Sequence, residues 1–330
     1  MAVIDMDLSQ PIATLLRTGT ADIHKETENS KGAGWLARCE LDREEYVRFI
    51  MMLWHVYDTL EQALERHSAH PVLSPTYSPA LLNRAPALAS DISHLLQTSE
   101  ASWQSHPLHQ SLTSSPPQGL TAYTSRISAI SDSADPSPLL AHSYVRYLGD
   151  LSGGQIVRRQ VVKAYGLQND GGLGSSFYEF KQLGGEKSGN IGDLKKIKEW
   201  YRDGMNQGAG DNPDRKFAIV QEAVMAFELN GGLFDELRAP TSPHLDDPSS
   251  PPLGNPNISD PSLPQEPKVV FDSEVISSKE STFSVSAVLS FILALGLAHF
   301  ALVVGGFTGA KGLAKWEIFQ EWFEGLLAAN

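Results

Sequence analysis

Cysteine is nearly absent from this sequence, which has a single one, Cys39, among its 330 residues. One thiol cannot form an intrachain disulfide, and no second cysteine is present to build a zinc site, so a reducing compartment is expected. Positive charge is scarce as well, because 26 lysines and arginines face 39 acidic residues, for a formal net charge of -13. Binding to nucleic acid needs basic groups that neutralise phosphates, and we therefore expect no nucleic-acid partner.

The N-terminal region also lacks a long apolar run, and it carries two early acids, Asp5 and Asp7. A secretory or transit signal has the opposite character, so we expect the bulk of the chain in the cytosol. Strand-like alternation of polar and apolar residues is scarce too. The overall composition, with 41% hydrophobic and 20% charged residues, is that of an ordinary packed domain.

Apolar residues recur at helical spacing from about residue 8 to residue 238. In 41–67 they fall at steps of three and four, at Tyr46, Phe49, Ile50, Leu53, Trp54, Tyr57, Leu60 and Leu64. Asp42 and Glu45 form a capping-box pattern at the start of this predicted helix. Weaker patterns of the same kind cover 11–30, 79–97, 119–131, 139–165, 191–205 and 213–237. The sequence therefore predicts an all-α domain over residues 1–238.

The composition changes abruptly after this domain. Residues 239–282 hold nine of the 20 prolines and seven acids against two lysines, which predicts a disordered linker. Residues 283–307 contain no charged residue and are long enough, at roughly 1.5 Å per residue, to cross a hydrocarbon layer of about 30 Å. We expect a transmembrane helix there, with a buried core helix as the alternative. Residues 308–330 then predict a short amphipathic tail.

The densest chemical signal lies in residues 141–155, which read AHSYVRYLGDLSGGQ. Gly149, Gly153 and Gly154 interrupt a helical pattern, each at a cost of about 1 kcal/mol relative to alanine. Two explanations are open: a close helix crossing, or a kink that lets the backbone lie against a flat ligand. Asp150, which lies among these glycines, could hold ordered water near such a ligand or simply cap a helix break.

This string closely resembles the signature of the haem oxygenases, and the resemblance extends over the whole domain. Residues 16–29 resemble the family's proximal segment, 57–61 its second long helix, and 201–206 and 226–234 its later helices. The resemblance implies the all-α haem oxygenase fold, with haem between a proximal helix and a kinked distal helix. It also implies a C-terminal membrane anchor, as in the membrane-bound members.

The proximal segment contains His24 and Glu28, which share one face of a helix. A carboxylate near the distal ring nitrogen can fix the imidazole tautomer for iron binding, although a pair at this spacing is more often a surface ion pair. The resemblance implies that His24 is the axial ligand of the haem iron. His55 and His142 are competitors that could equally be core residues. Because dioxygen needs the opposite side of the iron open, we favour a structural role for His142.

The resemblance further implies contacts to the haem propionates from four residues with cationic or hydroxyl side chains: Arg17, Tyr144, Lys198 and Arg202. Arg17 stands where relatives commonly carry lysine, which keeps the charge and permits bidentate pairing. The alternative for Lys195, Lys196 and Lys198 is that they form a solvated helix face without a ligand. Phe227 and Asn230 resemble residues of the family's haem cleft, but a core position explains Phe227 equally well.

The implied activity is oxidative cleavage of haem at the α-meso position to biliverdin, carbon monoxide and ferrous iron. It consumes O2 and electrons that NADPH supplies through a reductase, and haem b is both cofactor and substrate. By the resemblance, Asp150 holds the water that delivers a proton, Gly149 and Gly153 crowd the bound ligand, and Gly154 lies against the haem. A haem carrier or sensor of the same fold, without turnover, is the alternative.

The implied partners are NADPH-cytochrome P450 reductase or a similar electron donor, and biliverdin reductase. The implied location is the endoplasmic reticulum membrane, with the catalytic domain in the cytosol. Arg158, Arg159 and Lys163 form a basic strip on which an acidic reductase could dock, although a solvated helix face explains it equally well. Two segments depart from the family pattern, an insertion at 184–190 and a glycine-rich loop at 170–174.

Overall fold

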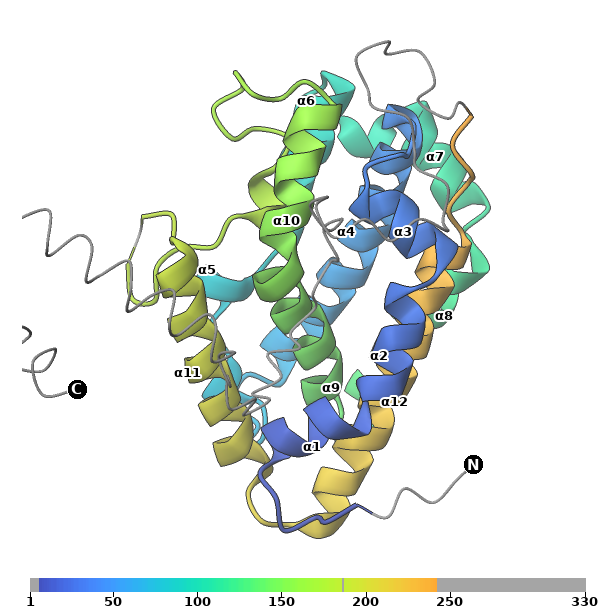
Figure 1. The fold of residues 1–330 in the computed structure, drawn as a ribbon. Helices are drawn as coiled ribbons and strands as arrows, with labels where there is room; N and C mark the ends of the chain where they lie inside the picture. Colours follow the sequence, from blue (N-terminus) through green and yellow to red (C-terminus); the bar gives the residue numbers. More distant parts are fainter. Residues whose placement is uncertain (1–5, 186, 242–330) are drawn as a thin grey trace, which may run out of the picture. The chain divides into compact units, whose positions relative to one another are not determined.

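The structure is a computed structural model that describes residues 6–185 and 187–241, and this part of the chain is helical (Figure 1). Its helices are α1 (Ile12–Gly19), α2 (Ala21–Glu28), α3 (Lys31–Ala37), α4 (Arg43–Arg66), α5 (Pro79–Leu82), α6 (Ala85–Leu96), α7 (Pro107–Ser114), α8 (Gln118–Ser131), α9 (Leu139–Ser143), α10 (Gly149–Ala164), α11 (Ile191–Ala209) and α12 (Pro213–Asp235). Short 3-10 turns (η1, η2 and η4) cover Ser74–Thr76, Trp103–Ser105 and Ser176–Tyr178, and a π-helix (η3) covers Tyr144–Leu148. The all-α prediction is confirmed for the described residues.

Several predicted helices are divided in the structure. The pattern at 11–30 corresponds to α1 and α2, which are separated at Thr20, and the pattern at 79–97 corresponds to α5 and α6. Helix α7 was not predicted. It has eight residues and few apolar ones, and it begins at a proline whose preceding residue, His106, accepts a hydrogen bond from the backbone N–H of Leu108 through its side chain.

The capping box predicted at the start of α4 is not formed. Asp42 occupies the N-cap position, but its carboxylate accepts hydrogen bonds from the backbone and hydroxyl of Thr241. The Glu45 carboxylate is bound by the buried guanidinium of Arg48 and by the backbone N–H of Arg238. The reason is tertiary: the chain that leaves α12 runs past the first turns of α4 and occupies both carboxylates.

Two long helices organise the described domain. Helix α4 packs against α6, α7, α8 and α9, and it contributes a series of fully buried side chains to the core: Tyr46, Ile50, Met51, Met52 and Tyr57. Helix α12 packs against α1, α2, α3, α8, α9 and the π-helix. Helix α1 contacts both α11 and α12 at one end of the bundle (Figure 1). In consequence α12 touches both the segment of His24 and the segment that precedes Gly149.

The predicted transmembrane helix, most of the predicted linker and the predicted tail lie outside the described residues. Within residues 6–185 and 187–241, no helix is both long and apolar enough to cross a membrane.

Candidate active site

The proximal residue His24 lies on α2, and Glu28 follows it on the same face, as its spacing predicts. Nδ1 of His24 lies 3.9 Å from Oε2 of Glu28, a distance for an electrostatic contact rather than a hydrogen bond. The ring of Phe227, from α12, meets the His24 imidazole edge to face with centroids 5.4 Å apart. The other ring nitrogen, Nε2, is buried. The imidazole is thus oriented from two sides, by α2 and by α12.

The distal segment contains a π-helix directly before the glycines. Tyr144–Leu148 form one wide turn between α9 and α10, and Gly149 is the first residue of α10. All five residues of the wide turn are buried, as are the five residues of α9 before it. The predicted irregularity is therefore present, but it precedes the glycines. Such turns occur frequently at functional sites.

Gly154 lies beside the η4 turn. A side chain built at this position would meet Cδ1 of Tyr178 at 3.4 Å. Tyr178 belongs to the η4 turn, which packs against α10, and its backbone carbonyl accepts a hydrogen bond from Gln155. The contact at Gly154 is at ordinary van der Waals distance, so it leaves both explanations of the glycines open.

Asp150 is held in a network of side chains from four elements. Tyr57 of α4 donates its hydroxyl hydrogen to the Asp150 carboxylate. Nε of Arg146, from the π-helix, donates to the same hydroxyl at 3.1 Å, and its guanidinium carbon lies 4.9 Å from the Tyr57 ring centroid. Nη1 of Arg146 donates to the side-chain oxygen of Asn230 on α12. The alternative in which Asp150 only caps a helix break does not account for these contacts.

The surroundings of Asp150 change its acidity. Burial raises the pKa of its carboxyl to about 6, although Arg146, the Tyr57 hydrogen bond and the more distant Arg84 act to lower it. Burial also keeps the pKa of Tyr57 well above its ordinary value, so this residue stays protonated and remains a donor. A carboxyl group with a pKa near 6 can both hold and release a proton near neutral pH.

The four predicted propionate contacts lie on neighbouring elements. Arg17 is exposed on α1, and Tyr144 is buried at the start of the π-helix. Lys198 and Arg202 are one turn apart on α11, which packs against both α1 and α10. Nζ of Lys198 lies 3.5 Å from the hydroxyl of Ser152 on α10. The structure thus brings α11 and its cations next to the distal helix.

The competing histidines have other partners. His142 is completely buried, and its Nε2 contacts a carboxylate oxygen of Glu222 at 2.9 Å. His55 lies with its Nε2 3.0 Å from that of His109 on α7. The structural role that we favoured for His142 agrees with this arrangement.

The sequence analysis did not identify the roles of Tyr57 and Arg146. In the sequence, Tyr57 is one of the apolar positions of a predicted helix, and Arg146 is one residue of the signature at 141–155. Their contacts join residues 93 and 89 positions apart along the chain, from Tyr57 to Asp150 and from Arg146 to Tyr57. Local spacing carries no signal for such a pair.

The basic strip of α10 is less free than the sequence suggested. Arg158 forms an ion pair with Glu179, while Arg159 and Lys163 are exposed. The structure therefore leaves two of the three predicted cations on the open face of the helix.

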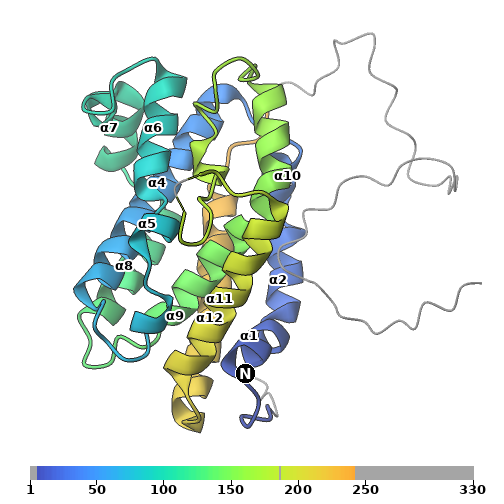
Figure 2. The ribbon, with the colours of Figure 1, turned by 90° about the vertical axis from the view of Figure 1, so that its left-hand side faces the viewer.

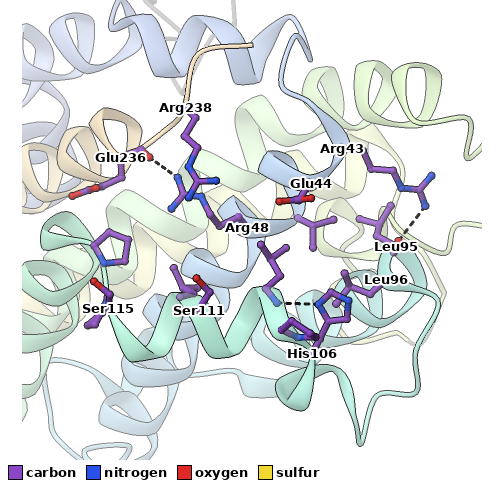
Figure 3. Close-up of a pocket in the computed structure, with 16 residues that line it drawn as sticks. Arg43, Glu44, Arg48, Leu95, Leu96, His106, Ser111, Ser115, Glu236 and Arg238 are labelled. Atoms are coloured by element: carbon purple, nitrogen blue, oxygen red, sulfur yellow. Dashed lines mark hydrogen bonds between the residues drawn. The ribbon is translucent and has the colours of Figure 1, made fainter. Parts of the chain in front are cut away.

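A separate groove of about 1050 Å³ lies along α7 and the first turns of α4 (Figure 3). Its cations are engaged with the protein: Arg43 donates to the carbonyl of Leu95, and Arg48 binds Glu45 and the carbonyl of Glu236. None of the predicted site residues lines it, so it is distinct from the candidate active site.

Comparison with known proteins identifies the family of this chain. The family model described as Heme oxygenase matches residues 10–236. The chain belongs to the haem oxygenase family. It is 32% identical to heme oxygenase 1 of Rattus norvegicus over 70% of this chain and 73% of that protein, and 36% identical to heme oxygenase 1 of Nostoc sp. over 70% of this chain and 87% of that one.

Solved structures of haem oxygenases have the same fold. The enzyme from Leptospira interrogans is 34% identical and superposes with a TM-score of 0.59, covering 69% of this chain and all of that one. Heme oxygenase-2 from Synechocystis, in complex with heme and NO, is 32% identical with a TM-score of 0.60, covering 69% and 85% of the two chains. The predicted fold class of the described domain is confirmed.

The residues present fit a haem. His24 offers a buried imidazole nitrogen of the kind that binds haem iron, and Phe227 supplies an aromatic wall beside it. Arg17, Lys198 and Arg202 provide cations for two carboxylates. The distal side offers a protonatable carboxyl group, which is suited to proton delivery.

Proposed function

We propose that this chain is a haem oxygenase that cleaves haem at the α-meso position to biliverdin, carbon monoxide and ferrous iron, using O2 and electrons from a reductase. The observation that carries the proposal is the network around Asp150. A carboxyl group with a pKa of about 6 is held by Tyr57 and Arg146, while α12 supports both Arg146, through Asn230, and His24. Family membership supplies the reaction class.

His24 is assigned as the axial ligand. Its Nδ1 faces Glu28, which leaves Nε2 as the nitrogen for the iron. The nearby carboxylate favours the tautomer with the proton on Nδ1, so that Nε2 presents its lone pair. Phe227 restricts rotation of the ring. When bound, haem supplies the iron that activates dioxygen and the carbon that is oxidised.

Asp150 is assigned as the residue that positions water and moves the proton. In its ionised form it accepts the Tyr57 hydrogen bond at one oxygen, Oδ2, and it can hold a water molecule at the other. Arg146 fixes the Tyr57 hydroxyl, and Asn230 fixes Arg146. The ionised carboxylate thus positions the water through which a proton reaches the distal side, and three neighbouring side chains set the orientation of that carboxylate.

The remaining assignments concern the orientation of the haem. Arg17, Tyr144, Lys198 and Arg202 bind the propionates, and this fixes which edge of the ring enters first. The absence of side chains at Gly149, Gly153 and Gly154 lets the distal backbone approach the ring plane. Orientation of this kind decides which meso carbon is attacked.

The wider organisation completes the proposal. Residues 1–238 form the catalytic domain, 239–282 a linker, 283–307 a transmembrane helix and 308–330 a short tail. The uncharged stretch 283–307 supports an anchor in the endoplasmic reticulum membrane with the domain in the cytosol. NADPH-cytochrome P450 reductase is the proposed electron donor, since a common membrane would raise its effective concentration.

The test is a visible spectrum of the full chain with ferric haem, followed after NADPH and reductase are added. The parent should lose its Soret band and yield biliverdin. His24→Ala should lose turnover and recover part of it with added imidazole, which a merely structural defect would not show. Asp150→Asn should keep haem bound and lose biliverdin formation. Stable haem in the parent under these conditions would support the carrier or sensor instead.

A further inference from the structure

The first turn of α1 is capped by a side chain from another helix. An α-helix leaves its first four backbone N–H groups without an intrahelical partner, and the residue before the helix commonly supplies an acceptor. In α1 that residue is Pro11, which makes no side-chain hydrogen bond. The N–H of Ala13 instead donates to Oδ1 of Asn206 on α11, at 3.0 Å and 193 positions away along the chain. Asn206 therefore joins the start of α1 to the last turn of α11.

Helix α11 is closely packed on the side opposite to Asn206. Residues two apart on an α-helix are separated by about 200° around its axis, so Gly204 and Gly208 both point away from Asn206. A side chain built at either glycine would collide with a backbone carbonyl oxygen, that of Pro75 or that of Val72. This close approach fixes the position of α11, and the hydrogen bond of Asn206 then sets the position of α1 relative to it.

A second side chain holds the residues that precede α1. Lys216, in the first turn of α12, is buried, and its ammonium group donates to the carbonyls of Leu8 and Gln10 at 3.1 and 3.0 Å. The start of α1, the end of α11 and the start of α12 lie together at one end of the bundle, as Figures 1 and 2 show. The start of α1 is thus tied to both neighbouring helices by side-chain hydrogen bonds.

The hydrogen bond of Asn206 lies one turn from a proposed propionate contact on each helix. Arg202 precedes Asn206 by four residues on α11, and Arg17 follows Ala13 by four residues on α1. Residues four apart share a helix face and are separated by about 6 Å along the axis. The bond between α1 and α11 therefore sets the separation of two cations that belong to different helices.

We propose that Asn206 is a positioning residue that fixes the spacing of Arg17 and Arg202, and thereby the rotation of the haem within its site. This inference rests on the proposed function, in which the two arginines bind the propionates. Two propionates held at one spacing give the ring one rotational position, and that position decides which meso carbon is attacked. Without the bond from Ala13, α1 can shift relative to α11, and the ring can occupy a second position.

The test compares three variants of the full chain. Asn206→Leu keeps the size of the side chain and removes the acceptor. Adding Pro11→Ser to it gives α1 a local cap, because a hydroxyl at this position can accept from the N–H of Ala13, but it does not restore the link to α11. Asn212→Leu is the matched control, since it removes an asparagine cap, bound by the N–H of Arg215, from the start of α12.

The haem-free chain provides two measurements. The melting temperature should fall by about 2 to 4 °C in Asn206→Leu and in Asn212→Leu, and Pro11→Ser should recover it in the first of these. Nitroxides at Thr18→Cys and Asp203→Cys, in a Cys39→Ser background, report the distance between α1 and α11 next to the two arginines. The distance distribution should broaden in Asn206→Leu, with or without the local cap, and should not change in the control.

The haem-loaded chain reports the position of the ring. The paramagnetic shifts of the haem methyl groups in the ferric cyanide complex show this position without turnover, and chromatography separates the biliverdin isomers after turnover. The parent and Asn212→Leu should give the same shifts and the α isomer. Asn206→Leu should add new methyl resonances and raise the share of other isomers several-fold, and Pro11→Ser should not reverse either change.

The proposal is overturned if Pro11→Ser restores the parental shifts and isomers, because Asn206 would then act through helix stability alone. It is also overturned if Asn206→Leu keeps the distances and shifts of the parent, or if Asn212→Leu changes them equally. Haem that stays intact in the parent would refute the proposed function instead, and the nitroxide distances and methyl shifts would still decide the role of Asn206.

Discussion

Removing the hydroxyl of Tyr57 offers a sharp test of how Asp150 works. In Tyr57→Phe the ring remains, so its contacts with the Arg146 guanidinium and with the Phe177 ring are kept. What is lost is the hydrogen bond that stabilises the ionised form of Asp150. The pKa of Asp150 should therefore rise further above its ordinary value.

The size of this effect follows from the contact. A hydrogen bond to a charged group contributes about 1.5 to 3 kcal/mol, and one pKa unit corresponds to about 1.4 kcal/mol, so a rise of about one to two units is expected. Arg146 still lowers the pKa of Asp150 in this variant, so the rise should lie at the lower end of that range. With a starting pKa of about 6, the ionised fraction at pH 7 would fall roughly two-fold to ten-fold.

The assay is single-turnover haem degradation from pH 5.5 to pH 9. In the parent, the rate depends on ionised Asp150 and should fall below about pH 6. In Tyr57→Phe the same fall should begin about one pH unit higher. At pH 9 Asp150 is ionised in both proteins, and their rates should agree. Tyr123→Phe is the matched control, since Tyr123 is equally buried and its hydroxyl has no hydrogen-bond partner in the described structure. An unchanged profile in Tyr57→Phe, or a shift to lower pH, would refute the assigned role.

Three further predictions concern stability. Burial alone would raise the pKa of Glu222, but hydrogen bonds from Arg126 and His142 lower it from 4.5 to about 2. The ionised Glu222 therefore stabilises the fold fully above pH 4.5, and this stabilisation is lost as the pH falls toward 2. Glu222→Gln should thus lower the free energy of unfolding in urea at pH 7 by about 3 kcal/mol and flatten its pH dependence; parallel curves would contradict this. A side chain at Gly208 would collide with a backbone carbonyl, whereas one at Gly231 has room. Alanine at position 208 should therefore lower the free energy of unfolding by about 1 to 3 kcal/mol and with it the melting temperature, and alanine at position 231 should change neither. Burial and a neighbouring imidazole lower the pKa of His55 from 6.5 to about 4, so stability is lost as the pH falls from 6.5 toward 4. The protection of the α7 amides against hydrogen exchange, taken relative to the intrinsic exchange rate at each pH, should therefore fall from pH 7 to pH 5 in the parent and not in His55→Gln.

Helices with strong periodicity and local end signals were predictable from the sequence. Helices α4, α8, α11 and α12 begin within two residues of the predicted positions, and their cap positions carry Asp42, Pro117, Asn190 and Asn212. Helix α7 was missed because its stability depends on contacts with α4 and the η2 turn. The π-helix was missed because the apolar spacing of residues 139–165 continues through it without a local signal for a wide turn.

The site was predictable only in part for a similar reason. His24 and Asp150 were identified through a resemblance to a family, and the structure adds the contacts around each. The partners of Asp150 come from α4, the π-helix and α12, and no spacing rule links them. Even the capping box at Asp42 and Glu45, a strong local signal, was wrong because residues that follow α12 compete for both carboxylates.

Helix α12 explains how the two sides of the site are held together. Phe227 contacts the proximal imidazole, and Asn230, three residues later on the same helix, binds the guanidinium that fixes Tyr57. Residues three apart on a helix are neighbours on its surface, so one rigid element sets both the orientation of His24 and the distal network. A displacement of α12 would therefore disturb the iron ligand and the proton path at the same time, while a change confined to α10 would disturb only the second.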